Sequence, residues 1–359
     1  MIEEQVTKLL KLTVDKKASD LHLRVPSPPV LRIDGALAPQ EDLPPVTVED
    51  VEKVFEHITT PEQRNTFLSE LELDFAYSIA GLARFRVSVM KQRNTISIAF
   101  RVVPFRVLTI DELGLPQICK ELILKPRGLI LVTGPTGSGK STTMAAMVNH
   151  LNENESRNVI TIEDPIEYLH SNKKCLIAQR DLGDDTRSFH IALVHALRHD
   201  PDVIIVGEMR DLDTITTAIR AAETGHLVLG TLHTTDAPQT VDRIIDIFPH
   251  GQQQQIRLQL SQVMEAILSQ TLLPRIGGGR IGAFEIMLAT PAVRNLIREQ
   301  KTFELHSIMQ LNSKDGMQTL DNALASLLRA GIITKEEALM KSSSPERLSK
   351  LLQLPHRSN

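Results

Sequence analysis

The sequence predicts a core of the α/β class that is preceded by a smaller α+β domain. From residue 128 onward, short apolar runs alternate with stretches of helical periodicity: GLILVTG, NVITIED, VIIVGE and HLVLGTLHT. This alternation is typical of parallel strands that are buried on both faces. In the first third, alternating apolar and polar residues indicate antiparallel strands with one solvated face. A length of 359 residues leaves room for roughly two domains.

The first domain is expected to begin with an amphipathic helix, because the apolar residues of segment 6–14 recur at helical spacing. Ser19 and Asp20 should introduce a short strand, LHLRV, and the pair Asp34-Gly35 predicts a hairpin. A helix is expected from about Val48, and residues 82–104 should form two antiparallel strands. These elements make up the α+β beginning of the chain.

We place the first domain at residues 1–105, a hinge with a short helix at residues 106–126, and the α/β core at residues 127–359. Beyond Pro249 the periodicity is mainly helical, interrupted by the glycine run 277–279. The core is therefore expected to end in a helical region.

Composition excludes several classes of protein. A net charge of −4 and an aromatic content of 3% give no general attraction for nucleic acid, so we expect no nucleic-acid partner. The two cysteines, Cys119 and Cys175, lack the spacing of a zinc site and are expected to be packing residues. The sequence shows neither an apolar run of spanning length nor a signal peptide, which predicts a cytoplasmic location.

The strongest local signal is the segment GPTGSGKST, which lies between an apolar strand and a helical stretch. Glycines allow successive backbone amides to turn towards phosphate oxygens, and the helix that follows adds its positive end. The lysine would neutralise the β- and γ-phosphates, and the serine hydroxyl would bind Mg²⁺. The alternative is a chance glycine-rich turn. The residues assigned to phosphate binding are Gly134, Pro135, Thr136, Gly137, Ser138, Gly139, Lys140, Ser141 and Thr142.

Acidic and imidazole side chains follow three of the predicted strands. Glu163 ends one strand and Glu208 follows another, and both should reach the carboxyl edge of the sheet, where ligands of α/β folds bind. Glu163 could orient a water molecule, and Glu208 could act on Mg²⁺ or on water. His233, and with less support His226, could donate a hydrogen bond to a terminal phosphate. For each of these residues the alternative is a structural role, as a helix cap, a surface acid or a packed histidine.

Taken in order, the segments GPTGSGKST, ITIEDPIE, VIIVGEMRD and TGHLVLGTLHT resemble the Walker A motif, Asp box, Walker B motif and His box of the secretion ATPase superfamily. The segments SDLHLR, RIDG, RFRV and AVRNLIRE resemble its PilT-like branch. The resemblance covers nearly the whole chain. It implies a RecA-like P-loop ATPase core behind a PAS-like domain, ATP and Mg²⁺ as cofactors, and a ring of six copies with ATP at the domain interface.

The same resemblance implies arginines from the first domain that reach the nucleotide. Arg84, Arg86, Arg93 and Arg101 lie in the acid-free interval between Asp74 and Asp111. Guanidinium groups stabilise charge on a transferring phosphoryl group. The alternative is an ordinary solvated basic face of the sheet.

The resemblance further implies a motor that retracts type IV pili and drives twitching motility. Its partners would be five further copies of the chain and an inner-membrane pilus platform protein of the PilC kind, with peripheral association at the cytoplasmic membrane. Assembly and secretion relatives usually carry a longer amino-terminal extension and a tetracysteine zinc module, and this sequence shows neither. The alternatives left open are an accessory ATPase of the PilU kind, a motor for another filament, and a scaffold that binds nucleotide without useful hydrolysis.

Overall fold

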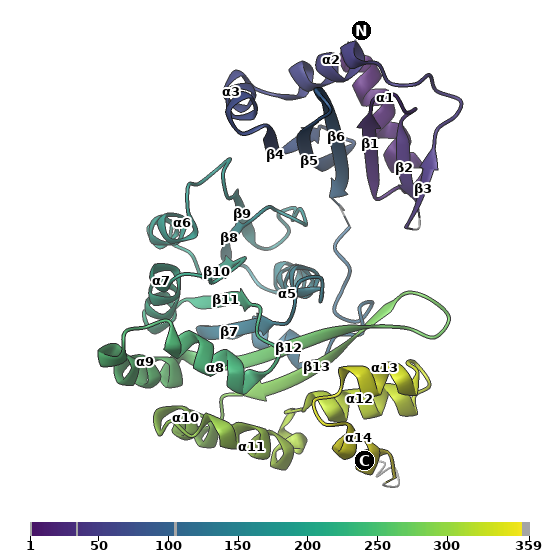
Figure 1. Ribbon diagram of the computed structural model, residues 1–359. Coiled ribbons are helices and arrows are strands. Elements are labelled where there is room, and N and C mark those ends of the chain that lie inside the picture. The colour runs from purple at the N-terminus through teal and green to yellow at the C-terminus, as the bar shows by residue number, and fades with distance from the viewer. Residues whose placement is uncertain (1, 34, 104–105, 354–359) are drawn as a thin grey trace. The chain divides into compact units, whose positions relative to one another are not determined.

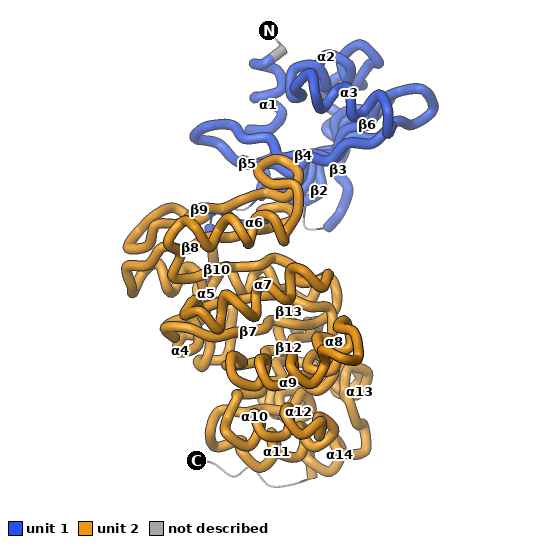
Figure 2. The backbone as a smooth tube through the Cα atoms, turned by 90° about the vertical axis from the view of Figure 1, so that its left-hand side faces the viewer, with its two compact units in different colours: residues 1–106, 167–169 blue, residues 107–166, 170–359 orange. Residues whose placement is uncertain are grey.

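A computed structural model describes residues 2–33, 35–103 and 106–353 of the chain. The chain divides into two compact units, coloured separately in Figure 2. Unit 1 comprises Met1–Arg106 and Glu167–Leu169, and unit 2 comprises Val107–Ile166 and His170–Asn359. In the part of the chain that the structure describes, we find no helix with the length and apolar character needed to cross a membrane.

Unit 1 is a six-stranded antiparallel sheet with helices packed on one face (Figure 1). The strand order is β3-β2-β1-β6-β5-β4. Its elements are α1 (Ile2–Asp15), β1 (Asp20–Arg24), β2 (Val30–Ile33), β3 (Ala36–Pro39), α2 (Val48–Ile58), α3 (Pro61–Glu70), β4 (Glu72–Ile79), β5 (Ala83–Gln92) and β6 (Thr95–Val103).

The sequence patterns account for most of unit 1. Alternate residues of β5, such as Phe85 and Val87, are buried against α1 and α2, while the residues between them face away from this core. Thr47 closes a capping box with Asp50, which explains why α2 begins at Val48 as expected. The amphipathic helix predicted from the apolar positions of segment 6–14 is confirmed as α1, and the predicted antiparallel pair is confirmed as β5–β6. Strands β2 and β3 form the predicted hairpin, although Asp34 of its turn lies outside the described residues.

Unit 2 contains a seven-stranded mixed sheet in the order β13-β12-β7-β11-β10-β8-β9. The strands are β7 (Gly128–Thr133), β8 (Asn158–Glu163), β9 (Leu176–Asp181), β10 (Val203–Val206), β11 (Leu227–Leu232), β12 (Met264–Pro274) and β13 (Arg280–Leu288). The helices are α4 (Ile118–Ile123), α5 (Lys140–Asn154), α6 (Phe189–Ala196), α7 (Leu212–Glu223), α8 (Ala237–Asp246), α9 (His250–Val263), α10 (Pro291–Arg298), α11 (Leu305–Leu311), α12 (Leu320–Arg329), α13 (Lys335–Lys341) and α14 (Pro345–Gln353), with short 3-10 turns η1 (Thr302–Glu304) and η2 (Ser313–Asp315).

Two hydrophobic cores lie on the two faces of this sheet. Helices α4 and α5 cover one face, and α6 to α11 cover the other. Strand β7 contributes to both, with Leu129 and Leu131 in one core and Ile130 and Val132 in the other. A strand buried on both faces reads as a continuous apolar run, which is why the four predicted strands were recognisable. The predicted fold class, an α/β core preceded by a smaller α+β domain, is confirmed.

The expected helical region beyond Pro249 is wrong over residues 264–288. Strands β12 and β13 form a long antiparallel hairpin there, and β12 also pairs in parallel with β7. The glycine run 277–279 belongs to its turn rather than to a break between helices. Most of β12 is buried on both faces, so its sequence lacks the alternation that marks a half-exposed strand. Strand β9, beside β8, is another strand that the patterns did not predict.

The segment expected to act as a hinge, residues 106–126, is largely a packed part of unit 2. From Ile110 onward most of its apolar side chains, including Cys119 and Leu122, are buried against β7 and α5. The boundary between the two compact units therefore falls at Arg106 and Val107, before this packed segment. Both cysteines are buried, and burial raises the pKa of the Cys119 thiol to about 12, as expected of a packing residue.

Candidate nucleotide-binding site

The segment 134–142 forms a loop that leads from the end of β7 into α5. Gly139, with φ of 91°, is the N-cap of α5, and left-handed backbone of this kind favours glycine. Lys140 Nζ donates hydrogen bonds to the carbonyl oxygens of Gly134 at 2.8 Å and Pro135 at 3.2 Å. Its ammonium group therefore lies across the loop, where phosphate oxygens could replace these carbonyls as acceptors.

The remaining loop residues differ in their exposure to solvent. Pro135, Thr136 and Gly137 are exposed, whereas Ser138 is buried. Ser141 and Thr142, in the first turn of α5, are half-buried. The exposed tip and the helix N-terminus that follows it form the arrangement that binds phosphate in P-loop proteins.

Strand β12 supports this loop from below, through residues that the sequence patterns did not single out. The amide of Gln270 donates to the Ser138 carbonyl and accepts a hydrogen bond from Thr143 Oγ1 at 2.8 Å. A Cβ atom at Gly134 would lie 2.3 Å from the Gln270 carbonyl oxygen, so only glycine fits there. The only sequence signal was a polar glutamine within the apolar run of β12.

Glu163 lies at the carboxyl end of β8, as predicted. Its Oε1 atom accepts hydrogen bonds from Thr161 Oγ1 at 2.7 Å and from Gln179 Nε2 at 3.0 Å. The backbone after β10 passes very close to Glu163, because a Cβ atom at Gly207 would lie 3.2 Å from the Glu163 Cα atom. Gly207 thus lets the ends of β8 and β10 approach each other, with Glu208 next in the chain.

Glu208, His233 and Lys140 form a hydrogen-bonded chain at the same edge of the sheet. His233 Nε2 lies 2.9 Å from Glu208 Oε1, and His233 Nδ1 lies 3.5 Å from Lys140 Nζ. A neutral imidazole that donates from Nε2 and accepts at Nδ1 satisfies both contacts. Three residues that each follow a different strand are therefore brought together, as predicted.

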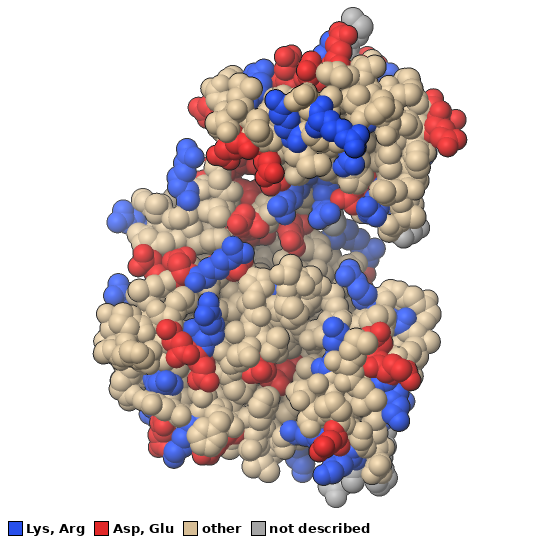
Figure 3. All heavy atoms as spheres, in the orientation of Figure 1, with Lys and Arg blue, Asp and Glu red and all other residues tan. Residues whose placement is uncertain are grey.

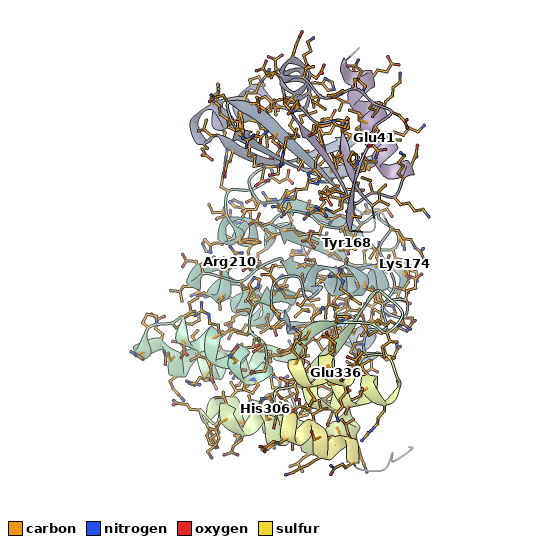
Figure 4. All side chains as sticks on the ribbon, turned by 45° about the vertical axis from the view of Figure 1, so that its right-hand side comes forward. Glu41, Tyr168, Lys174, Arg210, His306 and Glu336 are labelled. Carbon is orange, nitrogen blue, oxygen red and sulfur yellow. The ribbon has the colours of Figure 1, made fainter. Side chains whose placement is uncertain are left out.

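Arg210 also pairs with Glu208; its position after β10 is labelled in Figure 4. Burial alone would raise the pKa of Glu208, but the hydrogen bond from Arg210 and the nearby His233 hold this pKa below its ordinary value. Glu208 is therefore a carboxylate at neutral pH. Beside these residues a cavity of about 410 Å³ is also lined by Gln239 and Arg243 of α8.

The donor groups at this edge fit Mg²⁺ only when phosphate is present. Among the residues that the structure describes, no group of three or more His, Cys, Asp or Glu side chains could hold a metal ion. A serine hydroxyl at position 141 and the Glu208 carboxylate are hard oxygen ligands, and Mg²⁺ commonly takes one or two such ligands together with phosphate oxygens and water. The protein thus supplies a partial ligand set.

His226 does not belong to this group. It precedes β11, and its carbonyl accepts from the Gly128 amide at the amino end of β7, whereas the P-loop follows the carboxyl end of that strand. Its Nδ1 atom lies 2.9 Å from the Ala221 carbonyl near the end of α7. The length of a strand therefore separates His226 from the loop 134–142 of the same chain, and the predicted contact of His226 with nucleotide stays a prediction.

The four predicted arginines of unit 1 are divided by the sheet geometry. Arg86 is paired directly with Arg101 across β5 and β6, and Arg84 lies two residues away on the same face. This face is the one opposite α1 and α2. Arg93 instead lies in the β5–β6 turn, with φ of 44°, at the other end of the hairpin. The sheet therefore groups Arg84, Arg86 and Arg101 and leaves Arg93 apart.

Arg101 has a structural partner on the same face. Its Nε atom donates to Asp20 Oδ1 at 2.9 Å, and the Asp20 side chain is only 8% exposed. Burial alone would raise the pKa of Asp20, but hydrogen bonds from Ser19 and Arg101 hold this pKa below its ordinary value. On the face of unit 2 that Figure 3 shows, in contrast, basic and acidic side chains are interspersed.

The AVRNLIRE segment forms most of α10, and its apolar residues Val293, Leu296 and Ile297 are buried, as predicted. Arg294 holds this helix to its neighbours. Its guanidinium donates to the carbonyls of Ser261 and Gln262, near the end of α9, at 2.8 Å and 2.6 Å. Part of this motif therefore satisfies carbonyl groups that a helix end leaves without partners.

Comparison with known proteins places this arrangement in a family. The model of the family described as type II/IV secretion system protein matches residues 1–340. The type IV pilus retraction ATPase PilT of Pseudomonas aeruginosa is 48% identical over 341 residues, covering 95% of this chain and 99% of the relative. The type IV pilus ATPase PilU of the same organism is 40% identical over 348 residues, covering 97% and 91%.

A solved structure agrees with these sequence matches. The crystal structure of the pilus retraction motor PilT with bound ADP superimposes with a TM-score of 0.90 at 46% identity, covering 96% of this chain and 98% of the other. The expected resemblance to the PilT-like branch is therefore confirmed. With a family match that covers most of its length, this chain belongs to the type II/IV secretion system protein family.

Proposed function

We propose that this protein is a Mg²⁺-dependent ATPase that hydrolyses ATP to ADP and phosphate at the carboxyl edge of the unit 2 sheet. The observation that carries the proposal is the chain of contacts from Lys140 through His233 to Glu208. It joins a phosphate-binding lysine after β7 to an acidic residue after β10, which is separated from β7 by β11. The ADP in the related PilT structure supports a nucleotide as the ligand.

The residues have distinct roles in this proposal. Lys140 and the loop amides hold the β- and γ-phosphates. The Nε2–H of His233, which is bonded to Glu208 in the structure, turns to the terminal phosphate when nucleotide is bound. Glu163 accepts a proton from the attacking water, and Glu208 assists where Mg²⁺ leaves it an unoccupied oxygen. Mg²⁺, when bound, would offset negative charge on the phosphates through Ser141 and Glu208. Hydrolysis then relies on positioning and on stabilisation of developing charge.

We propose further that the ATPase powers retraction of type IV pili. The relative named PilT is matched over nearly the full length of both chains, which supports a whole-protein role of the same kind. In this proposal six copies form a ring at the cytoplasmic face of the inner membrane and act on a platform protein of the PilC kind. ATP-driven change in each copy would remove pilin subunits from the base of the filament.

Gene deletion tests the direction of this motor. Cells without the chain should carry more pili than wild-type cells and should lose twitching movement, because assembly continues while retraction stops. Electron microscopy of pili and a surface-motility assay measure the two effects. Loss of pili would instead indicate an assembly motor, and unchanged piliation and movement would contradict a main role in retraction.

The arginine face of unit 1 gives a second test. We propose that Arg86 supplies positive charge to the nucleotide of the same or another copy, so Arg86→Ala should lower kcat for ATP hydrolysis by about tenfold or more. Arg86 is exposed, so the melting temperature of unit 1 should change little. Steady-state phosphate release and thermal unfolding measure these effects.

Arg93→Ala is the matched control, since Arg93 is also an exposed arginine of the β5–β6 hairpin but lies at its turn. Its kcat should stay near the wild-type value. Equal losses in the two variants would mean that the position on the open face has no special importance.

A further inference from the structure

Gln179 is a polar residue of unit 2 that has no role in the proposed hydrolysis. It lies in β9, directly opposite Thr161 of β8 in the parallel register. Its Nε2 atom is 3.0 Å from Glu163 Oε1, and its Oε1 atom accepts a hydrogen bond from the His170 backbone amide at 2.8 Å. One amide therefore joins the proposed water-orienting acid to the loop that follows β8.

The orientation of this amide is fixed by its partners. A backbone N–H can only donate, so the oxygen of the Gln179 amide must face His170. The NH₂ group is then turned towards Glu163, whose carboxylate can only accept. Thr161 Oγ1 donates to the same carboxylate oxygen at 2.7 Å. Two donors from adjacent strands thus hold one oxygen of Glu163.

Such a carboxylate has little rotational freedom, because two hydrogen bonds to one oxygen determine the direction of the other. Hydrogen bonds to a charged acceptor are stronger than neutral ones. A general base gains its effect from being held within hydrogen-bond reach of the water that it activates. The residues around Glu163 therefore matter for turnover even where they touch no substrate.

We propose that Gln179 is a positioning residue for Glu163, which it aims by donating to Oε1 while His170 fixes its own orientation. This inference rests on the proposed function, since it takes Glu163 to be the acid that orients water. Gln179 is not assigned any contact with nucleotide. Its effect is expected on the chemical step and not on nucleotide binding.

The first test removes the amide. Gln179→Leu should lower kcat about 10- to 100-fold, the effect of losing a hydrogen bond to a charged group. The Kd for fluorescent ADP should stay near the wild-type value. Single-turnover phosphate release then compares Glu163→Ala with the double variant Glu163→Ala/Gln179→Leu. Because Gln179 acts through Glu163, its loss should have no further effect in the double variant.

The second test keeps the acceptor oxygen of the Gln179 side chain and replaces its NH₂ donor by a carboxylate oxygen. In Gln179→Glu, one carboxylate oxygen can still accept from His170, but the other now faces Glu163. Thr161 favours the charged form of Glu163, so a shared proton should reside on the new carboxyl group, which can then donate. The rate of this variant relative to wild type should rise as pH falls from about 8 to about 6. The relative rate of Gln179→Leu should not change with pH.

Gln318→Leu is the control, because Gln318 also donates from its amide, to the Phe284 carbonyl at 2.9 Å, in a part of unit 2 outside the proposed site. Its kcat should match that of wild type. Wild-type kcat in Gln179→Leu, or an equal further loss on the Glu163→Ala background, would overturn the positioning role. A relative rate of Gln179→Glu that does not change with pH would also contradict it. Wild-type turnover in Glu163→Ala alone would instead refute the proposed role of Glu163, a failure that needs no variant of Gln179 to detect.

Discussion

Lys140→Ala should abolish detectable ATP turnover and weaken ATP binding. The ammonium of Lys140 lies within hydrogen-bond reach of two loop carbonyls and beside His233, where phosphate oxygens would replace the carbonyls. Loss of a charge that stabilises the transition state costs at least about 10²-fold in rate. Steady-state phosphate release and binding of a fluorescent ATP analogue measure the two effects.

Lys174→Ala is a suitable control for that variant. Lys174 Nζ also donates to a backbone carbonyl, that of Asn154 at 3.2 Å, but at the far end of α5 from the loop. The control should keep wild-type turnover and affinity. Normal ATPase activity in Lys140→Ala would refute the assignment of the phosphate site, whatever the control shows.

The parts of the fold that the sequence predicted are those in which one physical pattern dominates. The strands leading to Glu163, Glu208 and His233 are short apolar runs, so their ends could be located and their side chains assigned to one edge of the sheet. The loop at Lys140 was predicted from the segment GPTGSGKST and its position between an apolar run and a helical stretch. In these places local sequence and tertiary position agree.

The errors arise where tertiary pairing decides the structure. Strand β12 lies beside β7 and is buried on both faces, so its residues show no period of two. Its importance to the site, through Gln270 beneath the P-loop, depends on a contact between residues more than a hundred positions apart. The support that Gln179 gives to Glu163 likewise depends on β9 pairing with β8. No local pattern contains this information.

The sequence analysis grouped two residues, His226 and Arg93, with residues from which the structure separates them. His226 and His233 are close in sequence, but strand β11 lies between them and sends them to opposite edges of the sheet. Arg93 is close in sequence to Arg86, but the rest of β5 separates the turn from the open face that Arg86 shares with Arg101. A strand rises by about 3.3 Å per residue, so a few residues of strand are enough to separate side chains that are close in sequence.

Glu208→Gln should retain nucleotide but hydrolyse it about 10²- to 10⁴-fold more slowly. The glutamine has nearly the same shape, and its amide oxygen can still accept from His233 Nε2. The substitution removes the negative charge that Arg210 and His233 maintain and that Mg²⁺ would require. Single-turnover phosphate release measures the rate, and a fluorescent ATP analogue measures the affinity.

Glu223→Gln provides the comparison for this variant. Glu223 is an exposed acid at the end of α7 that accepts from Gln259, and α7 begins shortly after Glu208 in the chain. The Glu223→Gln variant should hydrolyse ATP at the wild-type rate. The Glu223 side chain lies near the amino edge of the sheet, where it lines a cavity with Arg127 and Gly128. Slow hydrolysis in Glu208→Gln alone would tie the chemistry to the carboxyl edge. Wild-type phosphate release in that variant would remove Glu208 from the reaction and leave Glu163 as the proposed acid.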